Sequence, residues 1–150
     1  MNLHEYSDKR DFTRTPEPRG NVGKGMGVPV FVVQEHHSRH RHFDLRLEHE
    51  GVLVSWAVPK GVPESPGKKH LAVRTEDHPL AYAGFEGSIP EGEYGAGEVE
   101  IWDHGTYTLN TWTEDRIEVL LQGNRLKGRY LLVRFRRAGE NEWLLFKARE

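Results

Sequence analysis

The sequence predicts a mainly β protein, a compact antiparallel β-barrel of about eight short strands with long loops and little helix. Short apolar or alternating segments recur from residue 29 to the end of the chain, and turns rich in Gly, Asn and Asp separate them. No stretch has the long 3.6-residue apolar period of a convincing helix. With 150 residues, of which 36% are hydrophobic, the chain can bury one core of ordinary size.

The apolar segments place the strands in order along the chain. Strands are expected at residues 29–34, 43–49, 52–58, 71–75, 98–102, 106–109, 117–122, 129–135 and 142–148. Residues 103–105, Asp-His-Gly, are expected to form a turn between two of these strands. Residues 112–121 also fit one helix, which is the second interpretation of that segment.

Residues 1–150 are predicted to form a single domain, with residues 1–27 as a polar N-terminal arm rich in Pro and Gly. The arm ends in GNVGKGMG, which resembles a phosphate-binding loop only in its glycines. The Ser or Thr that follows the Gly-Lys pair of a Walker motif is missing, and no strand precedes the segment. We therefore expect a flexible arm.

Composition limits the possible functions. The formal net charge of -2 argues against a general coating of nucleic acid, so any nucleic-acid binding must be local. The absence of cysteine excludes disulfides, thiolate metal sites and a cysteine nucleophile, and leaves nitrogen and oxygen ligands for any metal. The charged N-terminus is not a secretory signal, and the longest aliphatic run, VPVFVV, is far too short to span a membrane. We expect a soluble cytoplasmic protein with no membrane partner.

The segment HHSRHRHFDLRLEH, residues 36–49, carries five of the nine histidines. Alternate residues of a strand share a face, so one face of this segment holds the polar series His42, Asp44, Arg46 and Glu48. The opposite face holds Phe43, Leu45 and Leu47 and is expected to lie on the core. Neutral imidazole and carboxylate together make a good ligand set for a divalent metal.

His36 can join His42 and Asp44 only if the polar residues between them form a loop, because an extended chain would hold His36 and His42 about 20 Å apart. The alternative for the whole cluster is a set of solvated surface side chains. His37, His40 and His49 are interpreted as surface residues or nucleic-acid contacts.

Two further residues favour phosphoryl chemistry. Arg46 lies on the same face as the two metal-ligand candidates, and a phosphoryl group accepts both a metal ion and a guanidinium. His78 precedes Pro79, which restricts the backbone of His78 to extended geometry. Since histidine ordinarily titrates near neutrality, we expect His78 to contact phosphate or to transfer a proton.

Several motifs resemble the 3′-phosphoesterase domain of bacterial DNA ligase D. They are KRDF, TPEP, QEHHSRHRHFDLRLE, SWAVPKG, LAVRTEDHPLAYAGFEGSIPEGEYGAG and EWLLFKA, and they run in order from about Tyr6 to the C-terminus. No polymerase or ligase segment accompanies them, so we expect a free-standing member of the family.

The resemblance implies a compact β-barrel and a metal-dependent enzyme that favours manganese, with zinc or cobalt as other possible ions. It implies an activity that removes a 3′-terminal ribonucleoside from DNA during repair and then hydrolyses the remaining 3′-phosphate to a hydroxyl. DNA or RNA-tipped primer-template 3′ ends are the implied partners, together with a separate ligase, polymerase or end-binding protein.

The resemblance also assigns residues. It implies three metal ligands, which are His36, His42 and Asp44. It implies that Arg46 and His78 hold the scissile phosphate with Tyr82 close by, and that the supporting groups are Arg10, Asp11, Glu17, Gln34 and Lys60. One departure from the family pattern is His70, which stands where an arginine phosphate contact is expected before LAVR and can make activity more sensitive to pH.

Two other functions fit parts of the same pattern. A mononuclear non-haem iron oxygenase would use His42, Asp44 and His78 as a facial triad of ligands. A non-catalytic module that binds DNA ends would use the metal only to hold its structure.

Overall fold

The computed structural model describes residues 2–25 and 27–149, so Met1, Met26 and Glu150 lie outside the description. Its short helical elements are the α-helix α1 (His4–Asp8) and the 3-10 helix η1 (Leu80–Gly84). Its strands are β1 (Val30–His37), β2 (His42–His49), β3 (Val52–Val58), β4 (Lys69–Arg74), β5 (Gly87–Ile89), β6 (Gly97–Trp112), β7 (Arg116–Gly123), β8 (Lys127–Arg134) and β9 (Glu142–Lys147).

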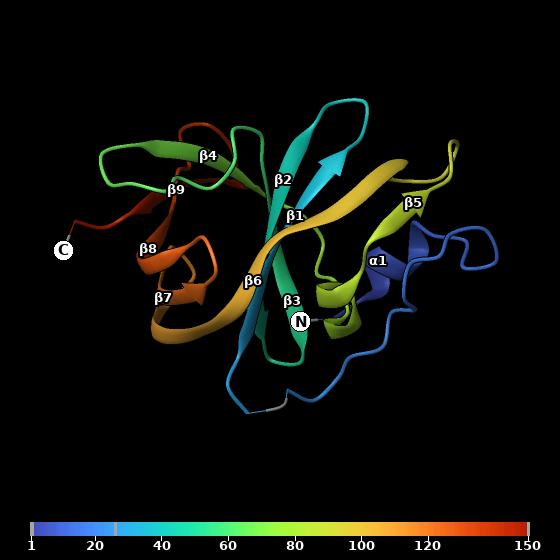
Figure 1. The fold of residues 1–150 in the computed structure, drawn as a ribbon, viewed down its shortest axis with the longest axis horizontal. Helices are drawn as coiled ribbons and strands as arrows, with labels where there is room; N and C mark the ends of the chain where they lie inside the picture. The colour runs from blue at the N-terminus through green and yellow to red at the C-terminus, as the bar shows by residue number, and fades with distance from the viewer. Residues whose placement is uncertain (1, 26, 150) are drawn as a thin grey trace.

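Eight antiparallel strands close into a barrel. Neighbouring strands pair in the order β1, β2, β3, β4, β9, β8, β7, β6, and β6 pairs back with β1 to complete the circle (Figure 1). The short strand β5 pairs with the first residues of β6, beyond the closed barrel. Closure leaves no unpaired barrel edge. The predicted fold class is therefore confirmed.

Strand β6 corrects two details of the prediction. The segment 103–105 is not a turn, because residues 97–112 form one continuous strand. The register against β1 shifts between Val33 and Gln34, where Trp102 has no partner. Asp103 is buried, and its carboxylate accepts three backbone N–H groups from the turn between β7 and β8. The helix considered for residues 112–121 is also wrong, because most of that segment belongs to β7.

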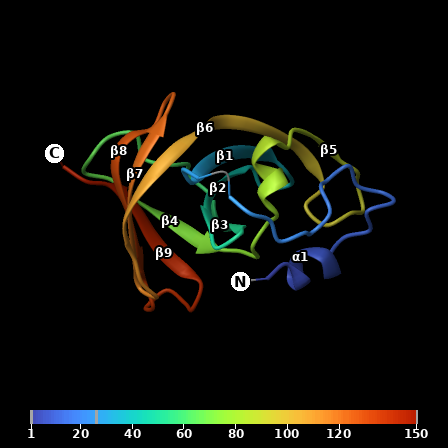
Figure 2. The same cartoon turned by 90° about the horizontal axis from the view of Figure 1, so that it is seen from below.

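Both faces of strands β1 to β3 are buried. Their apolar face, which includes Leu45, Leu47 and Trp56, lines the interior of the barrel as expected. Their other face is covered from outside by the N-terminal segment with α1, by η1 and by the region around β5 (Figure 2). This outer layer encloses the polar side chains that the sequence analysis singled out.

The start of the N-terminal arm is ordered against the barrel, in contrast to the expected flexible arm. Tyr6 of α1 is fully buried, and Leu3 and Glu17 are almost so. The Tyr6 hydroxyl donates a hydrogen bond to the backbone oxygen of Pro18 and so ties α1 to the segment that follows it. Within the described residues, no helix combines the length and apolar character needed to cross a membrane.

Candidate active site

The three proposed metal ligands meet on the outer face of the β1–β2 hairpin. His36 lies opposite His42 in the strand pairing, and the neighbouring pair on the same face is Gln34 with Asp44. The polar residues 38–41 form the loop that reverses the chain between the two strands. The loop required to bring His36 to the site is therefore present.

The distances among these side chains fit a single ion. Ligand atoms of His36, His42 and Asp44 all lie within 4.8 Å of one another. The Asp44 Oδ2 atom is 3.3 Å from His42 Nε2 and 3.8 Å from His36 Nδ1. Two imidazoles and one carboxylate form a nitrogen and oxygen ligand set of the kind that manganese, zinc, cobalt and iron accept.

Backbone carbonyls orient both imidazoles toward Asp44. His36 Nε2 lies 2.6 Å from the oxygen of Gly95, and His42 Nδ1 lies 2.9 Å from the oxygen of His40. A neutral histidine that donates to these carbonyls keeps its other nitrogen free as a lone-pair ligand. Outer contacts of this kind normally fix the tautomer of a metal-binding histidine. The residues present therefore fit a divalent metal ion.

The charges around Asp44 keep its carboxylate ionised. Burial disfavours the charged form, but Arg46, His42 and His36 together outweigh burial and lower the pKa of Asp44 below its usual value. The hydrogen bond to Asp44 raises the pKa of His42, whereas burial lowers the pKa of His36. A cation that binds here therefore competes with protons for the imidazole lone pairs, and it does so more strongly at His42 than at His36.

Arg46 is buried and held from three sides. Its Nε donates a 2.7 Å hydrogen bond to Gln34 Oε1, and its guanidinium lies 4.8 Å from the centre of the Tyr82 ring. Its Nη2 atom is 3.6 Å from Asp44 Oδ2. Gln34 in turn donates to the backbone oxygens of Tyr82 and Phe85. A permanently charged fork is therefore fixed beside the metal ligands.

His78 lies against the same guanidinium, and its ionisation differs from the expectation. Its Nδ1 is 3.2 Å from Arg46 Nη1 and 3.0 Å from the backbone oxygen of Glu76. Burial, followed by the positive charges of Arg46 and Arg10, lowers the pKa of His78 well below its ordinary value. Burial and these two charges therefore favour the neutral ring of His78, whereas a histidine of ordinary pKa titrates near neutrality.

Arg10, Glu17 and Tyr82 form one buried network beside His78. Glu17 accepts hydrogen bonds from Arg10 Nε at 3.0 Å, from Thr15 Oγ1 at 2.9 Å and from the Tyr82 hydroxyl at 2.6 Å. Burial raises the pKa of Tyr82 far above its usual value, so the phenol stays protonated. The N-terminal segment thus places Arg10 and Glu17 in the wall of the same cavity as His78.

These groups line a cavity of about 250 Å³. Of the predicted site residues, the cavity walls include Arg10, Glu17, His36, His42, Asp44, Arg46, His78 and Tyr82. Gln34 lies behind Arg46 and supports it, as described above.

The remaining predicted residues, Asp11, Lys60 and His70, are not among the lining side chains. Asp11 accepts hydrogen bonds from the backbone N–H and the hydroxyl of Thr13, so it shapes the turn that leads to Glu17. His70 Nδ1 lies 2.5 Å from the oxygen of Gly61, next to the exposed Lys60. His70, in β4, therefore packs against the turn after β3 that carries Lys60.

Two site residues were missed. Glu76 is buried, accepts from Lys9 at 2.8 Å and from Arg10 at 3.2 Å, and lies 3.9 Å from His78 Nε2. Tyr94 lines the cavity beside Gly95. The spacing of Glu76 two residues before His78, in an extended segment, is a signal that could have placed both on one face. No local signal distinguishes Tyr94.

A second group of potential ligands, Glu35, His37 and Glu100, lies on the surface. Arg41 already donates to Glu35, which reduces the charge available to a cation. His37 is exposed, in agreement with its interpretation as a surface residue.

Comparison with known proteins gives the family. Residues 34–134 match the family described as the DNA Ligase D 3'-phosphoesterase domain. The chain is 52% identical over 137 residues to the multifunctional non-homologous end joining protein LigD of Mycobacterium bovis, an alignment that covers 88% of this chain and 18% of that protein. It is 46% identical over 156 aligned positions to the LigD protein of Pseudomonas aeruginosa, which covers 99% of this chain and 19% of the relative.

The LigD protein of Mycolicibacterium smegmatis is 44% identical over 160 aligned positions, which cover 99% of this chain and 21% of that protein. The chain therefore spans about a fifth of the length of the curated relatives it matches. The match includes the hairpin that carries His36, His42 and Asp44 and the segment that carries His78. On this evidence, the chain belongs to the DNA ligase D 3′-phosphoesterase domain family.

Proposed function

We propose that this protein is a metal-dependent 3′-end-healing phosphoesterase of DNA repair. It removes a 3′-terminal ribonucleoside as a phosphodiesterase, and then removes the 3′-phosphate as a phosphomonoesterase to leave a 3′-hydroxyl. The observation that carries this proposal is the meeting of three potential metal ligands with a buried guanidinium in one cavity, where Arg46 Nη2 lies 3.6 Å from Asp44 Oδ2.

His36, His42 and Asp44 would hold the ion, and manganese is the ion we propose, with zinc and cobalt as other candidates for this donor set. The chemistry that a divalent ion supplies in such a site is Lewis-acid polarisation of a phosphoryl oxygen. The His36 and His42 rings need no rearrangement to serve as ligands, because Gly95 and His40 already fix their orientation.

Arg46 is proposed to bind the scissile phosphate. Its charge is permanent and its Nε is already used by Gln34, so an anion would bind at the two terminal nitrogens, which now lie 3.2 Å from His78 Nδ1 and 3.6 Å from Asp44 Oδ2. Its pairing with Asp44 is long enough for a phosphate oxygen to compete for the same N–H groups.

His78 is proposed to act as a neutral hydrogen-bond partner of the phosphate in the free enzyme. His78 Nδ1 faces both an Arg46 N–H and the Glu76 carbonyl, and the tautomer that we propose is the one in which Arg46 donates to Nδ1 and the ring proton lies on Nε2, where it can be donated. An arriving phosphate would add negative charge next to the ring, which favours protonation of His78 and hence proton transfer to the departing oxygen.

The two alternative functions have less support. The oxygenase alternative needs His78 as a ligand with His42 and Asp44, yet the ligand atoms that cluster are those of His36, His42 and Asp44. Arg46 lies between His78 and Asp44, where its positive charge opposes a cation held by those two residues. A purely structural metal would not require the buried Arg46 guanidinium beside it.

We propose DNA or RNA-tipped primer-template 3′ ends as the substrates. The relatives from Mycobacterium bovis and Pseudomonas aeruginosa are named as multifunctional proteins of non-homologous end joining. A ligase, polymerase or end-binding protein that acts on the same DNA ends is the partner class we propose.

The test of this function uses a primer that ends in a 3′-phosphate. Wild-type protein with manganese should release inorganic phosphate, and EDTA should stop the release. Consumption of an oxo-acid cosubstrate without phosphate release would favour the oxygenase. Tight DNA binding without turnover in manganese, zinc or cobalt would favour the binding module.

A further inference from the structure

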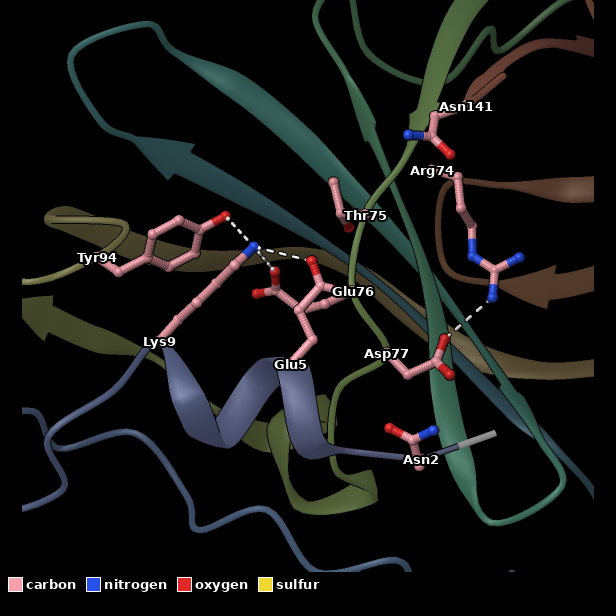
Figure 3. A pocket seen from close by; sticks show the side chains of 9 residues that line it. All are labelled: Asn2, Glu5, Lys9, Arg74, Thr75, Glu76, Asp77, Tyr94 and Asn141. Atoms are coloured by element: carbon pink, nitrogen blue, oxygen red, sulfur yellow. Dashed lines mark hydrogen bonds and ion pairs between the residues drawn. The ribbon is translucent and has the colours of Figure 1, made fainter. Parts of the chain in front are cut away.

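A second and larger hollow of about 650 Å³ opens beside the candidate active site (Figure 3). The side chains of α1 form one wall, the segment after β4 forms another, and Tyr94 and Asn141 come from two other loops (Figure 3). The hollow shares Thr75, Glu76 and Tyr94 with the cavity of the metal ligands. A ligand bound there would therefore extend directly from a phosphate held in the active site.

The charges of this hollow disfavour an anionic ligand. Lys9 pairs with Glu5 at 3.1 Å and with Glu76 at 2.8 Å, and Arg74 pairs with Asp77 at 3.1 Å. Both lining cations are thus occupied, and the lining carboxylates outnumber them. The remaining polar groups are neutral hydrogen-bonding side chains, namely Asn2, Thr75, Asn141 and the Tyr94 hydroxyl. The hollow suits an uncharged polar ligand.

Tyr94 stands at the boundary between the two cavities and is 49% exposed. The Lys9 ammonium lies 4.6 Å from the centre of its ring and 3.4 Å from its hydroxyl oxygen. The next residue, Gly95, is held against His36 through its carbonyl. The ring is thus fixed near the metal ligands with part of its surface free, and an exposed aromatic ring can stack on a nucleobase.

The opening on the other side of the active site is lined by one cation, Arg39, and one carboxylate, Glu91, whereas carboxylates outnumber cations in the hollow beside Lys9. The loop between β1 and β2 presents the exposed Arg39, which forms no ion pair within residues 2–25 and 27–149. The hollow beneath Arg39 has a volume of about 640 Å³ and shares Ser38 and Ile89 with the metal-ligand cavity. A cation that is free to bind phosphate is therefore present on this side.

The two products of the proposed diester cleavage also differ in charge, one being uncharged and the other anionic. Water adds to phosphorus, the bond from phosphorus to the 5′ oxygen of the terminal nucleoside breaks, and that oxygen takes up a proton. The departing nucleoside is then uncharged, whereas the retained strand keeps all its phosphates.

We propose that the hollow beside Lys9 is the subsite for the departing 3′-terminal nucleoside, with Tyr94 stacked on its base and Arg39 on the side of the retained strand. This inference rests on the proposed function. It predicts that Tyr94 matters for the diester step and has no base to contact in the monoester step, because a primer with a 3′-phosphate end has no nucleoside beyond the phosphate.

The experiment compares two primers of the same sequence, one with a terminal ribonucleoside and one with a 3′-phosphate. The readout is the ratio of kcat/KM for the diester to kcat/KM for the monoester. Tyr94→Ala should lower this ratio about tenfold, as expected for a lost base stack, and Tyr94→Phe should keep it within about twofold. Arg39→Ala should lower both values and leave the ratio unchanged. Phe135→Ala is the matched control, because it removes an exposed aromatic side chain outside both cavities.

A primer that ends in a ribose without a base completes the test. On this primer, wild type should show the same low ratio of diester to monoester kcat/KM that Tyr94→Ala shows on the primer with a complete terminal ribonucleoside. Tyr94→Ala should not lower kcat/KM further on the base-less primer. Equal effects of Tyr94→Ala on both steps, or full wild-type activity on the base-less end, would overturn the subsite. Wild type that performs neither step would overturn the proposed function as well, so the two failures are distinguishable.

Discussion

His36 and His42 face each other across the β1–β2 pairing, with ring centroids 4.9 Å apart. Six positions separate them in the sequence, yet the hairpin makes them direct neighbours. Asp44 follows two residues after His42 on the same face. A single hairpin therefore carries the whole proposed ligand set together with Arg46, and the rest of the fold buries it and brings His78 and Tyr82 against Arg46.

Replacing Asp44 by Asn should remove the metal and both activities. The change is nearly isosteric, but it removes the only negative charge among the three ligands and leaves Arg46 facing an amide. We expect the affinity for manganese to fall by more than about tenfold. Titration of Mn²⁺ followed by electron paramagnetic resonance measures this directly. His40→Ala is the control, because only the backbone oxygen of His40 contacts the site. Unchanged affinity in Asp44→Asn would show that the metal lies elsewhere.

Gln34→Ala should slow both steps while metal binding persists. The substitution leaves Arg46 Nε and the oxygens of Tyr82 and Phe85 without their buried partner. Unmet buried hydrogen bonds cost about 1–3 kcal/mol of stability. Denaturant unfolding of the variant measures its loss of stability, and metal titration of the same sample shows whether its affinity for manganese is unchanged. Gln122→Ala is the matched control, because Gln122 is exposed. If this control lost as much activity and stability as Gln34→Ala, a specific role for Gln34 would be ruled out.

Glu17→Gln should loosen the N-terminal segment. The carboxylate is buried and accepts from Arg10, Thr15 and Tyr82, so its neutral amide loses charge-assisted bonds worth about 1–3 kcal/mol. Urea unfolding should show this loss, and hydrogen exchange should become faster in α1. Glu114, whose side chain is 82% exposed, is the control, and its replacement by Gln should cost less than about 0.5 kcal/mol. A wild-type unfolding curve for Glu17→Gln would contradict the network.

His78 should make the stability of the protein depend on pH below neutrality. Its folded pKa lies well below the ordinary value of 6.5, so between these two values the unfolded chain binds a proton that the folded chain does not. Stability associated with His78 is therefore complete above pH 6.5 and is lost as the pH falls toward the folded pKa. The largest slope is about 1.4 kcal/mol per pH unit.

The measurement is the free energy of unfolding from about pH 7 to about pH 5 for wild type and His78→Gln. The substitution should make the curve flatter over this range. Parallel curves for the two proteins would mean that His78 has an ordinary pKa in the folded protein. That result would contradict the effect expected from burial of the ring beside Arg46 and Arg10.

The β-barrel and the clustering of His42 and Asp44 on one face of the hairpin could be predicted because their signals are local. Alternation in FDLRLEH separates Leu45 and Leu47 from Asp44 and Arg46, and the structure keeps that division. The burial of the polar face could not be predicted in the same way. It depends on Tyr6 and on η1, which lie far from the hairpin in the sequence.

Two other features depend on long-range contacts. Asp103 belongs to an Asp-His-Gly segment of the kind found in turns. In the structure its carboxylate faces the β7–β8 turn and accepts three backbone N–H groups of that turn, so strand β6 continues through Asp103. The low pKa of His78 comes from burial and from two arginines that the fold brings close. Neither neighbourhood is visible in the residues next to Asp103 or His78.

The central claim is that His36, His42 and Asp44 hold the metal used for stepwise healing of a 3′ end. The most direct test is a time course with a 5′-labelled primer-template that ends in one ribonucleotide, with wild type and Asp44→Asn. Wild type with manganese should first form a primer that is one nucleotide shorter and ends in 3′-phosphate, and then convert it to the 3′-hydroxyl. Asp44→Asn, and wild type in EDTA, should form neither product. Cleavage that survives EDTA, or equal product formation by Asp44→Asn, would contradict the account.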